Sequence, residues 1–261
     1  MNILITGAKR GIGHHTAIEL AKRNHLVYVT THYKEDALSL NRKFRNKENL
    51  IAFKLDITKK EDRNKIKNLE IDVLINNAAI GESGSISEIP IDLVRDTFNT
   101  NVFSTFELIQ LVLSDMIKKD KGKIISIGST VGTMPKTWMG VYSATKASIE
   151  TLLITLRREL QYINSNVKVI LIEAGAFHTG FNQDMIKSKN KWFDNNSYFY
   201  NIKKELYEEE DKFFKKIEKK ELDTIVNKIV SAVESDNPKF RYTVPISHYL
   251  VSKLYKIFIN K

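Results

Sequence analysis

Residues 124–146 read IISIGSTVGTMPKTWMGVYSATK, and this stretch joins a buried-strand pattern to a tyrosine and a lysine on the following helix. The apolar run 124–128 predicts a strand that is followed by Ser129. Tyr142 and Lys146 are spaced i, i+4, which places both side chains on one face of the helix. An unperturbed tyrosine has a pKa of about 10, so a nearby ammonium would favour the phenolate and allow proton exchange closer to neutral pH.

The spacing Tyr-x-x-x-Lys carries little information by itself, because it occurs three times in the chain. The other copies are Tyr200/Lys204 and Tyr249/Lys253. Only the first copy has a serine 13 residues upstream at the end of a strand pattern. With that serine, the segment resembles the short-chain dehydrogenase/reductase family, classical type, whose active site holds a serine, a tyrosine and a lysine at this spacing. The resemblance implies an NAD(P)-dependent oxidoreductase that acts on an alcohol or a carbonyl group.

Short apolar runs alternate with longer helical patterns along the chain, which is typical of a parallel sheet covered by helices on both faces. The sequence therefore predicts an α/β fold, with a single doubly wound Rossmann-type domain over residues 1–261 and a seven-stranded parallel sheet. The expected strands are 2–6, 26–31, 50–55, 73–76, 123–128, 167–173 and 242–244. The expected helices lie near 12–23, 35–46, 59–68, 91–118, 141–163, 198–219 and 222–234.

Length and composition agree with one intracellular domain. The 261 residues, 42% of them hydrophobic, are enough for one sizeable core. The absence of cysteine excludes a disulfide framework and a thiolate metal site, and the six histidines lack metal-ligand spacing, so no metal is expected. No apolar run approaches the roughly 18 residues of a membrane span, and the N-terminus lacks a signal-peptide pattern. We expect a cytoplasmic protein with no membrane partner.

The formal net charge of +10 raises the alternative of a nucleic-acid-binding protein. The basic residues are scattered among acidic ones, as in 203–205 and 208–211, which is typical of a solvated helical face. A basic protein can also favour an anionic cofactor. We therefore expect no nucleic-acid partner.

The first expected strand is followed by the segment 7–13, GAKRGIG, and then by a helix. Glycines allow the backbone to approach a pyrophosphate, and the N–H groups and dipole of a new helix favour the anion. The spacing Gly-x-x-x-Gly-x-Gly is not the Gly-x-Gly-x-x-Gly fingerprint, but it matches the variant of the resembled family. An ordinary strand-to-helix turn is the alternative. The residues expected to contact the cofactor here are Gly7, Lys9, Arg10, Gly11, Ile12 and Gly13.

The end of the second strand predicts which cofactor is preferred. A carboxylate there would bind the ribose 2′-hydroxyl of NAD, whereas the 2′-phosphate of NADP prefers basic neighbours. Thr31 and then His32 stand at this place, and both are expected to contact the cofactor. Arg10 lies where NADP-preferring members of the family often carry a basic residue. We expect NADP(H) to be preferred and NAD(H) to be possible. Alternatively, Glu35 or Asp36 reaches the ribose, although acids commonly begin a helix at such a place.

Further cofactor contacts are expected after the third, fourth and sixth strands, because ligands of open α/β sheets bind beyond the carboxyl ends of the strands. Asp56 resembles the adenine-contacting aspartate of the family, although it could instead cap the next helix. Two positions depart from the family pattern: Ala79 replaces a glycine and Ala174 replaces a proline. The expected contacts are Asp56, Ile57, Asn77, Ala78, Gly175 and Thr179, together with Tyr142 and Lys146.

Asn101 falls in the middle of the helix expected at 91–118. Asparagine is a poor residue for a helix interior because its amide competes for backbone groups. Asn101 matches the asparagine that, in the resembled family, holds a water linking the lysine to solvent; Asn99 is the nearby alternative. The catalytic tetrad implied by the resemblance is Asn101, Ser129, Tyr142 and Lys146.

The resemblance also implies a role for each of the other three tetrad members. Ser129 would polarise the substrate oxygen, and Tyr142 would exchange a proton with that oxygen during hydride transfer. Lys146 would lower the pKa of the tyrosine and bind the nicotinamide ribose. A non-catalytic NADP(H)-binding protein with a regulatory or redox-sensing role is the alternative.

Less constrained segments would select the small-molecule carbonyl or alcohol substrate. The loop 134–140 and residues 177–200 carry apolar side chains, which either line an apolar pocket under a lid at about 180–220 or pack beneath an insertion. The amphipathic segment 246–261 is expected to dock on the core or on a sister subunit, with membrane binding as the alternative. In the resembled family the helices at 91–118 and 141–163 form subunit interfaces, so we expect a homo-dimer or homo-tetramer.

Overall fold

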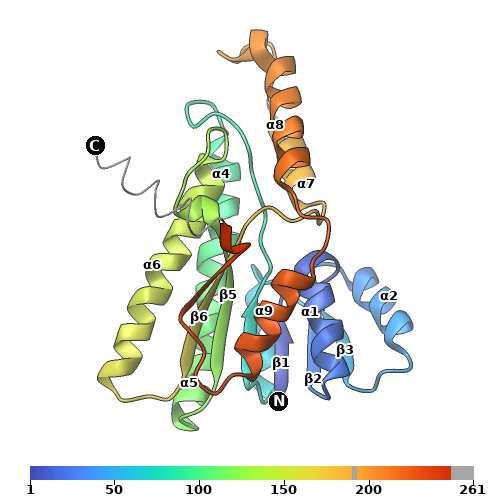
Figure 1. The fold of residues 1–261 in the computed structure, drawn as a ribbon, viewed down its shortest axis with the longest axis vertical. Coiled ribbons are helices and arrows are strands. Elements are labelled where there is room, and N and C mark those ends of the chain that lie inside the picture. The colour runs from blue at the N-terminus through green and yellow to red at the C-terminus, as the bar shows by residue number, and fades with distance from the viewer. Residues whose placement is uncertain (190–192, 248–261) are drawn as a thin grey trace.

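The computed structural model describes residues 1–189 and 193–247. A seven-stranded sheet forms its centre, and every pair of neighbouring strands is parallel (Figure 1). The strand order is β3-β2-β1-β4-β5-β6-β7. The strands are β1 (Asn2–Ile5), β2 (Leu26–Thr31), β3 (Leu50–Lys54), β4 (Val73–Asn76), β5 (Lys123–Ser129), β6 (Lys168–Ala174) and β7 (Arg241–Val244). The predicted parallel sheet is confirmed, and each strand begins and ends within one residue of its expected position.

Helices cover both faces of the sheet. Successive side chains of a strand point to opposite faces, so the apolar side chains of these strands are buried against helices on each side. Ile3 and Ile5 of β1 pack in a core with α1, α2 and α9, whereas Leu4 packs in a second core with α5 and α6. The helices are α1 (Gly11–Lys22), α2 (Lys34–Phe44), α3 (Lys60–Asn64), α4 (Ile91–Phe98), α5 (Thr105–Lys118), α6 (Gly140–Tyr162), α7 (Phe181–Ser188), α8 (Lys203–Ile217) and α9 (Asp223–Glu234). The doubly wound arrangement is therefore confirmed.

Three segments differ from the predicted helices. The helix expected at 91–118 is interrupted by a π-helical turn at Asn99–Ser104, which separates α4 from α5. The helix expected at 59–68 is α3 followed by a 3-10 turn at Lys65–Asn68. The helix α7 was not expected, because it is only 8 residues long and lies in a stretch without a clear apolar period.

The helices α7 and α8 follow β6 in the chain, and α8 projects away from the sheet (Figure 1). The predicted docking of segment 246–261 falls almost entirely on residues 248–261, which lie outside the described residues. Among the described residues, no helix is both long enough and apolar enough to span a bilayer.

Candidate active site

The carboxyl ends of β1 to β6 border one cleft of about 1050 Å³, and α7 and α8 border it on another side. Gly7 follows β1, Thr31 ends β2 and Asn77 follows β4, although these residues are far apart in the sequence. Ser129 and Ala174 reach the same cleft from β5 and β6. The parallel sheet therefore brings the predicted cofactor segments to one place, as expected for an open α/β fold.

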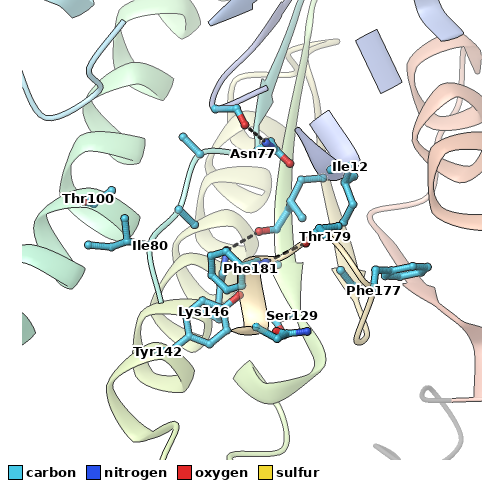
Figure 2. Close-up of a pocket in the computed structure, with 18 of the residues that line it drawn as sticks. Ile12, Asn77, Ile80, Thr100, Ser129, Tyr142, Lys146, Phe177, Thr179 and Phe181 are labelled. Carbon is cyan, nitrogen blue, oxygen red and sulfur yellow. Dashed lines mark hydrogen bonds between the residues drawn. The ribbon is translucent and has the colours of Figure 1, made fainter. Parts of the chain in front are cut away.

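Ser129, Tyr142 and Lys146 lie together in this cleft (Figure 2). Tyr142 is only 8% exposed, and the centroid of its ring lies 5.4 Å from that of Phe181 on α7. Burial raises the pKa of the Tyr142 phenol, and the nearby Ser129 hydroxyl partly opposes this change. Burial therefore outweighs the lowering of the phenol's pKa that is expected from Lys146.

The position of the Lys146 ammonium explains this difference. Its Nζ donates a hydrogen bond of 2.8 Å to the carbonyl of Ile127 and lies 5.6 Å from the centroid of the Tyr142 ring. Burial lowers the pKa of Lys146 to about 8. Removal from water acts on both groups, and each is shifted toward its neutral form.

Asn101 lies on the π-helical turn and holds the backbone that leaves β4. Its amide oxygen accepts a hydrogen bond of 2.9 Å from the N–H of Ile80, and its Nδ2 donates at 2.8 Å to the carbonyl of the same residue. Nδ2 also lies 3.1 Å from the hydroxyl of Thr145, next to Lys146. Asn99 is exposed. Asn101 does not line the cleft itself, but it fixes Ile80, which does. π-Turns within helices often occur at functional sites.

The glycine segment 7–13 makes a tight turn into α1. Gly7 and Gly11 have φ angles of +64° and +66°, a conformation that side chains rarely adopt. A Cβ at Gly7 would lie 2.7 Å from the Cα of Ala78, so the turn needs glycine to pass the segment after β4. Asn77 supports this contact, because its Nδ2 donates to the carbonyls of Thr6 and Gly7. The N–H groups at the start of α1 can therefore face a bound phosphate closely.

Gly13 was expected to contact the cofactor, but it does not line the cleft. A Cβ there would lie 2.6 Å from Nδ2 of Asn77. Gly13 is thus needed for close packing of α1 against the segment after β4. Thr179 lies on the opposite side of the turn, where a Cβ added to Gly11 would meet its side chain at 2.9 Å.

Basic and acidic side chains alternate at the end of the cleft near β2. Lys9 forms an ion pair of 2.9 Å with Asp36, which lines the cleft, whereas Glu35 does not line it. Arg10 forms an ion pair with Asp184 of α7. The alternative that Asp36 reaches a bound ribose is therefore compatible with its position.

Three further residues predicted at this end line the cleft in different ways. Thr31 is 1% exposed, and its hydroxyl donates to the carbonyl of Tyr33 at 2.8 Å. His32 is largely exposed, with Nδ1 3.8 Å from Asp56. Asp56 accepts hydrogen bonds from the N–H and hydroxyl of Thr58, so it caps the following turn while it also lines the cleft.

The remaining predicted cofactor contacts also line the cleft. They are Ile12, Ile57, Ala78 and Gly175. The N–H of Gly175 donates at 2.7 Å to the carbonyl of Val244 in the strand beside it, which ties this loop to β7 although Ala174 replaces a proline. Within the described ranges, no group of three or more His, Cys, Asp or Glu side chains could hold a metal ion.

A small apolar cluster packs around Tyr142, and three of its members, Met139, Tyr142 and Phe214, line the cleft. Its buried members, which we call the Tyr142 cluster, are Met139, Tyr142, Met185, Ile186 and Phe214. They come from the start of α6 and from α7 and α8. Sequence patterns singled out neither Phe214 nor Ile186, because the period of α8 and the short α7 do not show which side faces the site.

A buried ion pair connects α7 and α8 beneath this cluster. Lys189 is 1% exposed and pairs with Glu210 of α8, and both side chains lie within hydrogen-bonding distance of the Ser83 hydroxyl. Burial lowers the pKa of Lys189, although its hydrogen bond to Glu210 opposes the shift. The pair holds the two helices against the segment that follows β4. No sequence signal distinguishes these two residues from the other charged residues of the chain.

Comparison with known proteins agrees with this arrangement. A family model described as short chain dehydrogenase matches residues 1–190. The NADPH-dependent 3-dehydrocapnine reductase of Ornithobacterium rhinotracheale is 29% identical over 253 residues, covering 92% of this chain and 87% of that protein. The 3-ketodihydrosphingosine reductase of Bacteroides thetaiotaomicron is 33% identical over 179 residues, covering 69% of this chain and 65% of that protein.

Among solved structures, a short-chain dehydrogenase/reductase from Burkholderia phymatum in complex with NAD matches with a TM-score of 0.84. The sequences are 17% identical, and the match covers 99% of this chain and 94% of that chain. At this identity the likeness shows the fold alone.

Proposed function

This chain belongs to the short-chain dehydrogenase family of NAD(P)-dependent oxidoreductases, and we propose that it transfers a hydride between NADP(H) and a carbonyl or alcohol group of an apolar substrate. One observation carries the proposal. The Ser129 and Tyr142 side chains lie together in the cleft that the glycine turn also lines (Figure 2). A proton donor and a second hydroxyl at the end of a dinucleotide-sized cleft are the groups that carbonyl reduction requires.

A side chain at Gly7 or Gly11 would collide with Ala78 or Thr179, so the turn needs glycine at both positions. The backbone of such a tight turn can lie close to the phosphates of a dinucleotide. When bound, the nicotinamide cofactor supplies or accepts the hydride. The residues proposed to hold its phosphates are Gly7, Lys9, Arg10, Gly11 and Ile12. Those proposed for the adenosine end are Thr31, His32, Asp56 and Ile57. Those proposed for the nicotinamide end are Asn77, Ala78, Tyr142, Lys146, Gly175 and Thr179.

The residues Ser129 and Tyr142 would act on the substrate oxygen. During reduction both hydroxyls hydrogen-bond that oxygen, and Tyr142 donates its proton as negative charge develops there. The phenol is protonated at neutral pH, so it can donate a proton to the substrate oxygen. Lys146 would add positive charge next to the phenol and bind the cofactor ribose.

Asn101 would position the active site through the Ile80 backbone. Replacing Asn101 with Ala removes the partner of both backbone groups of Ile80, and we expect the free energy of unfolding to fall by about 1–3 kcal/mol. We also expect kcat to fall by about tenfold, as Ile80 and Thr145 lose their common support. Chemical denaturation and NADPH consumption measure the two effects. Asn99→Ala is the matched control, because Asn99 is exposed; equal effects of the two variants would contradict this role.

The preference for NADP(H) is supported by the basic side chains Lys9, Arg10 and His32 in the cleft. The relative from O. rhinotracheale is described as NADPH-dependent. A carboxylate at Thr31 would repel the 2′-phosphate and bind a free 2′-hydroxyl. Thr31→Asp is therefore expected to lower the ratio of kcat/KM for NADPH to that for NADH by at least about tenfold, whereas Thr31→Ser should change it little. A wild-type protein that uses NADH better than NADPH would refute this assignment.

The names of both relatives describe reductases, and the second describes a keto compound as the substrate. The apolar Tyr142 cluster supports a substrate with an apolar part. We propose that α7 and α8 form the lid over this part, at about residues 180–220. The test is NADPH consumption with a panel of ketones, aldehydes and quinones. Binding of NADPH without turnover of any member would favour the regulatory alternative.

Two further proposals concern the assembly and the location of the protein. Phe103, next to the helices that form interfaces in the resembled family, is 57% exposed. This exposed aromatic ring supports a homo-dimer or homo-tetramer. A cytoplasmic location stays a prediction.

A further inference from the structure

Lys136 lies on the loop that joins β5 to α6, between Ser129 and Tyr142 in the chain. Its side chain lines the cleft, and its Nζ lies 2.6 Å from the centroid of the Phe213 ring and 5.4 Å from that of Phe214. Both rings belong to α8, and Phe214 is a member of the Tyr142 cluster. The Lys136 ammonium is therefore held at the apolar end of the cleft, on the side of α8.

The rings of Phe213 and Phe214 contact this ammonium, and further apolar side chains line the same cleft. Those that line the same end of the cleft include Val131, Met134, Met139, Phe181, Phe213 and Ile217. The carboxylates that line the cleft, Asp36 and Asp56, lie at its other end, near β2 and β3. A positive charge in such surroundings is disfavoured unless it has a partner.

The Lys136 ammonium lacks a direct counter-ion within residues 1–189 and 193–247, where no carboxylate oxygen lies within 4.0 Å of it. Glu210 is the carboxylate that acts on it through space, but Glu210 is already paired with Lys189. Burial lowers the pKa of Lys136 to about 8. The group therefore still carries its charge in most molecules at neutral pH.

We propose that Lys136 binds an anionic group of the substrate, so that the substrate class is a carbonyl compound with an apolar portion and a carboxylate, sulfonate or phosphate. The apolar portion packs in the Tyr142 cluster while its carbonyl oxygen meets Ser129 and Tyr142. This inference rests on the proposed reductase function and specifies which carbonyl compounds the site selects. A hydrogen bond between two charged groups in a partly buried site is expected to make an anion bind at least about tenfold more tightly than a neutral compound of the same chain length.

A different role for Lys136 predicts different results. Its cation–π contact with Phe213 could serve only to pin α8 to the loop. In that case Lys136→Met and Phe213→Ala would weaken the binding of every substrate to a similar degree. If Lys136 binds an anion, Lys136→Met removes the preference for anionic ligands, whereas Phe213→Ala retains it.

The first experiment measures binding by isothermal titration calorimetry with four probes of equal chain length: octanoate, octanesulfonate, octanol and octylammonium. Saturating NADP⁺ is present, so that the phosphate-binding end of the cleft does not take up the anions. For the wild type we expect both anions to bind at least about tenfold more tightly than octanol, with octylammonium weakest. Lys136→Met should bind octanoate and octanol equally, while Lys136→Arg should keep the preference.

Lys212→Met is the matched control, because Lys212 is an exposed lysine of α8 in a surface ion pair with Glu208. It should leave the order of the four probes unchanged. The proposal is wrong if the wild type does not distinguish octanoate from octanol, or if Lys136→Met keeps the wild-type preference.

The second experiment compares the reduction of 7-oxooctanoate with that of its methyl ester. For the wild type we expect a lower KM for the acid with a similar kcat, and for Lys136→Met we expect equal KM values. Reduction of both compounds with equal KM by the wild type would refute the anion site and leave the reductase function intact. If neither compound nor any member of the carbonyl panel is reduced, the reductase function fails, while the calorimetric order still tests the anion site.

Discussion

Tyr142→Phe is expected to abolish nearly all turnover while the affinity for NADPH stays within about twofold of the wild type. The phenylalanine ring fills the same volume beside Phe181, so the Tyr142 cluster remains packed. What is lost is the hydroxyl that lies in the cleft with Ser129 and would donate the proton. General acid catalysis contributes roughly 10²- to 10⁴-fold, and we expect kcat to fall by about 10³-fold.

The measurement is NADPH consumption with the best carbonyl of the panel, combined with a fluorescence titration of NADPH binding. Tyr200→Phe is the matched control, since Tyr200 belongs to a second Tyr-x-x-x-Lys copy and is 42% exposed. It should have wild-type activity. Ser129→Ala should lower kcat by a smaller factor, because Tyr142 can still donate its proton. Wild-type turnover by Tyr142→Phe would show that another group supplies the proton.

Lys189→Met is expected to destabilise α7 and α8 by about 3–5 kcal/mol, because it leaves the carboxylate of Glu210 buried without its cation. Lys189 is 1% exposed and Glu210 is 6% exposed, so little water can replace the lost partner. Amide hydrogen exchange in α8 should become at least about 100-fold faster. Carbonyl reduction should weaken as well, since Phe214 of α8 belongs to the Tyr142 cluster.

Two variants separate the buried charge from other effects of the substitution. The double variant Lys189→Met/Glu210→Leu removes both charges and should recover most of the stability, because an apolar pair can replace a buried ion pair. Lys215→Met breaks an exposed pair with Asp211 and should change the stability by less than about 1 kcal/mol. If Lys189→Met is no less stable than Lys215→Met, the buried pair does not anchor these helices.

The sheet could be predicted from the sequence because its strands are buried on both faces. In a parallel sheet such strands are continuous apolar runs, such as Ile124-Ile125 in β5, and each run ends where a polar or glycine residue begins the next turn. The π-helical turn at Asn99–Ser104 could not be predicted in the same way. The unfavourable Asn101 marks the position, but the shift in hydrogen-bonding register depends on the contact between its amide and Ile80.

The candidate site could be predicted where its residues lie next to strand ends. Gly7, Ser129 and Asn77 are examples, since topology alone brings such positions together. The buried ion pair between Lys189 and Glu210 could not be predicted, because it depends on how α7 and α8 fold back over the cleft. Lys189 and Glu210 are 21 residues apart, and neither has a local pattern that indicates burial. The high pKa of Tyr142 was also missed, since spacing reveals its neighbours but not the loss of water around it.

The Tyr142 cluster has a consequence for how this protein can evolve. Its side chains pack apart from the two cores that stabilise the sheet. Mutations in α7 and α8 can therefore change the shape of the cleft without destabilising the sheet. Tyr142 is itself a member of that cluster, however. A mutation that changes which substrate the cluster binds therefore also changes the surroundings of the reactive phenol. Substrate specificity and catalytic rate must then evolve together.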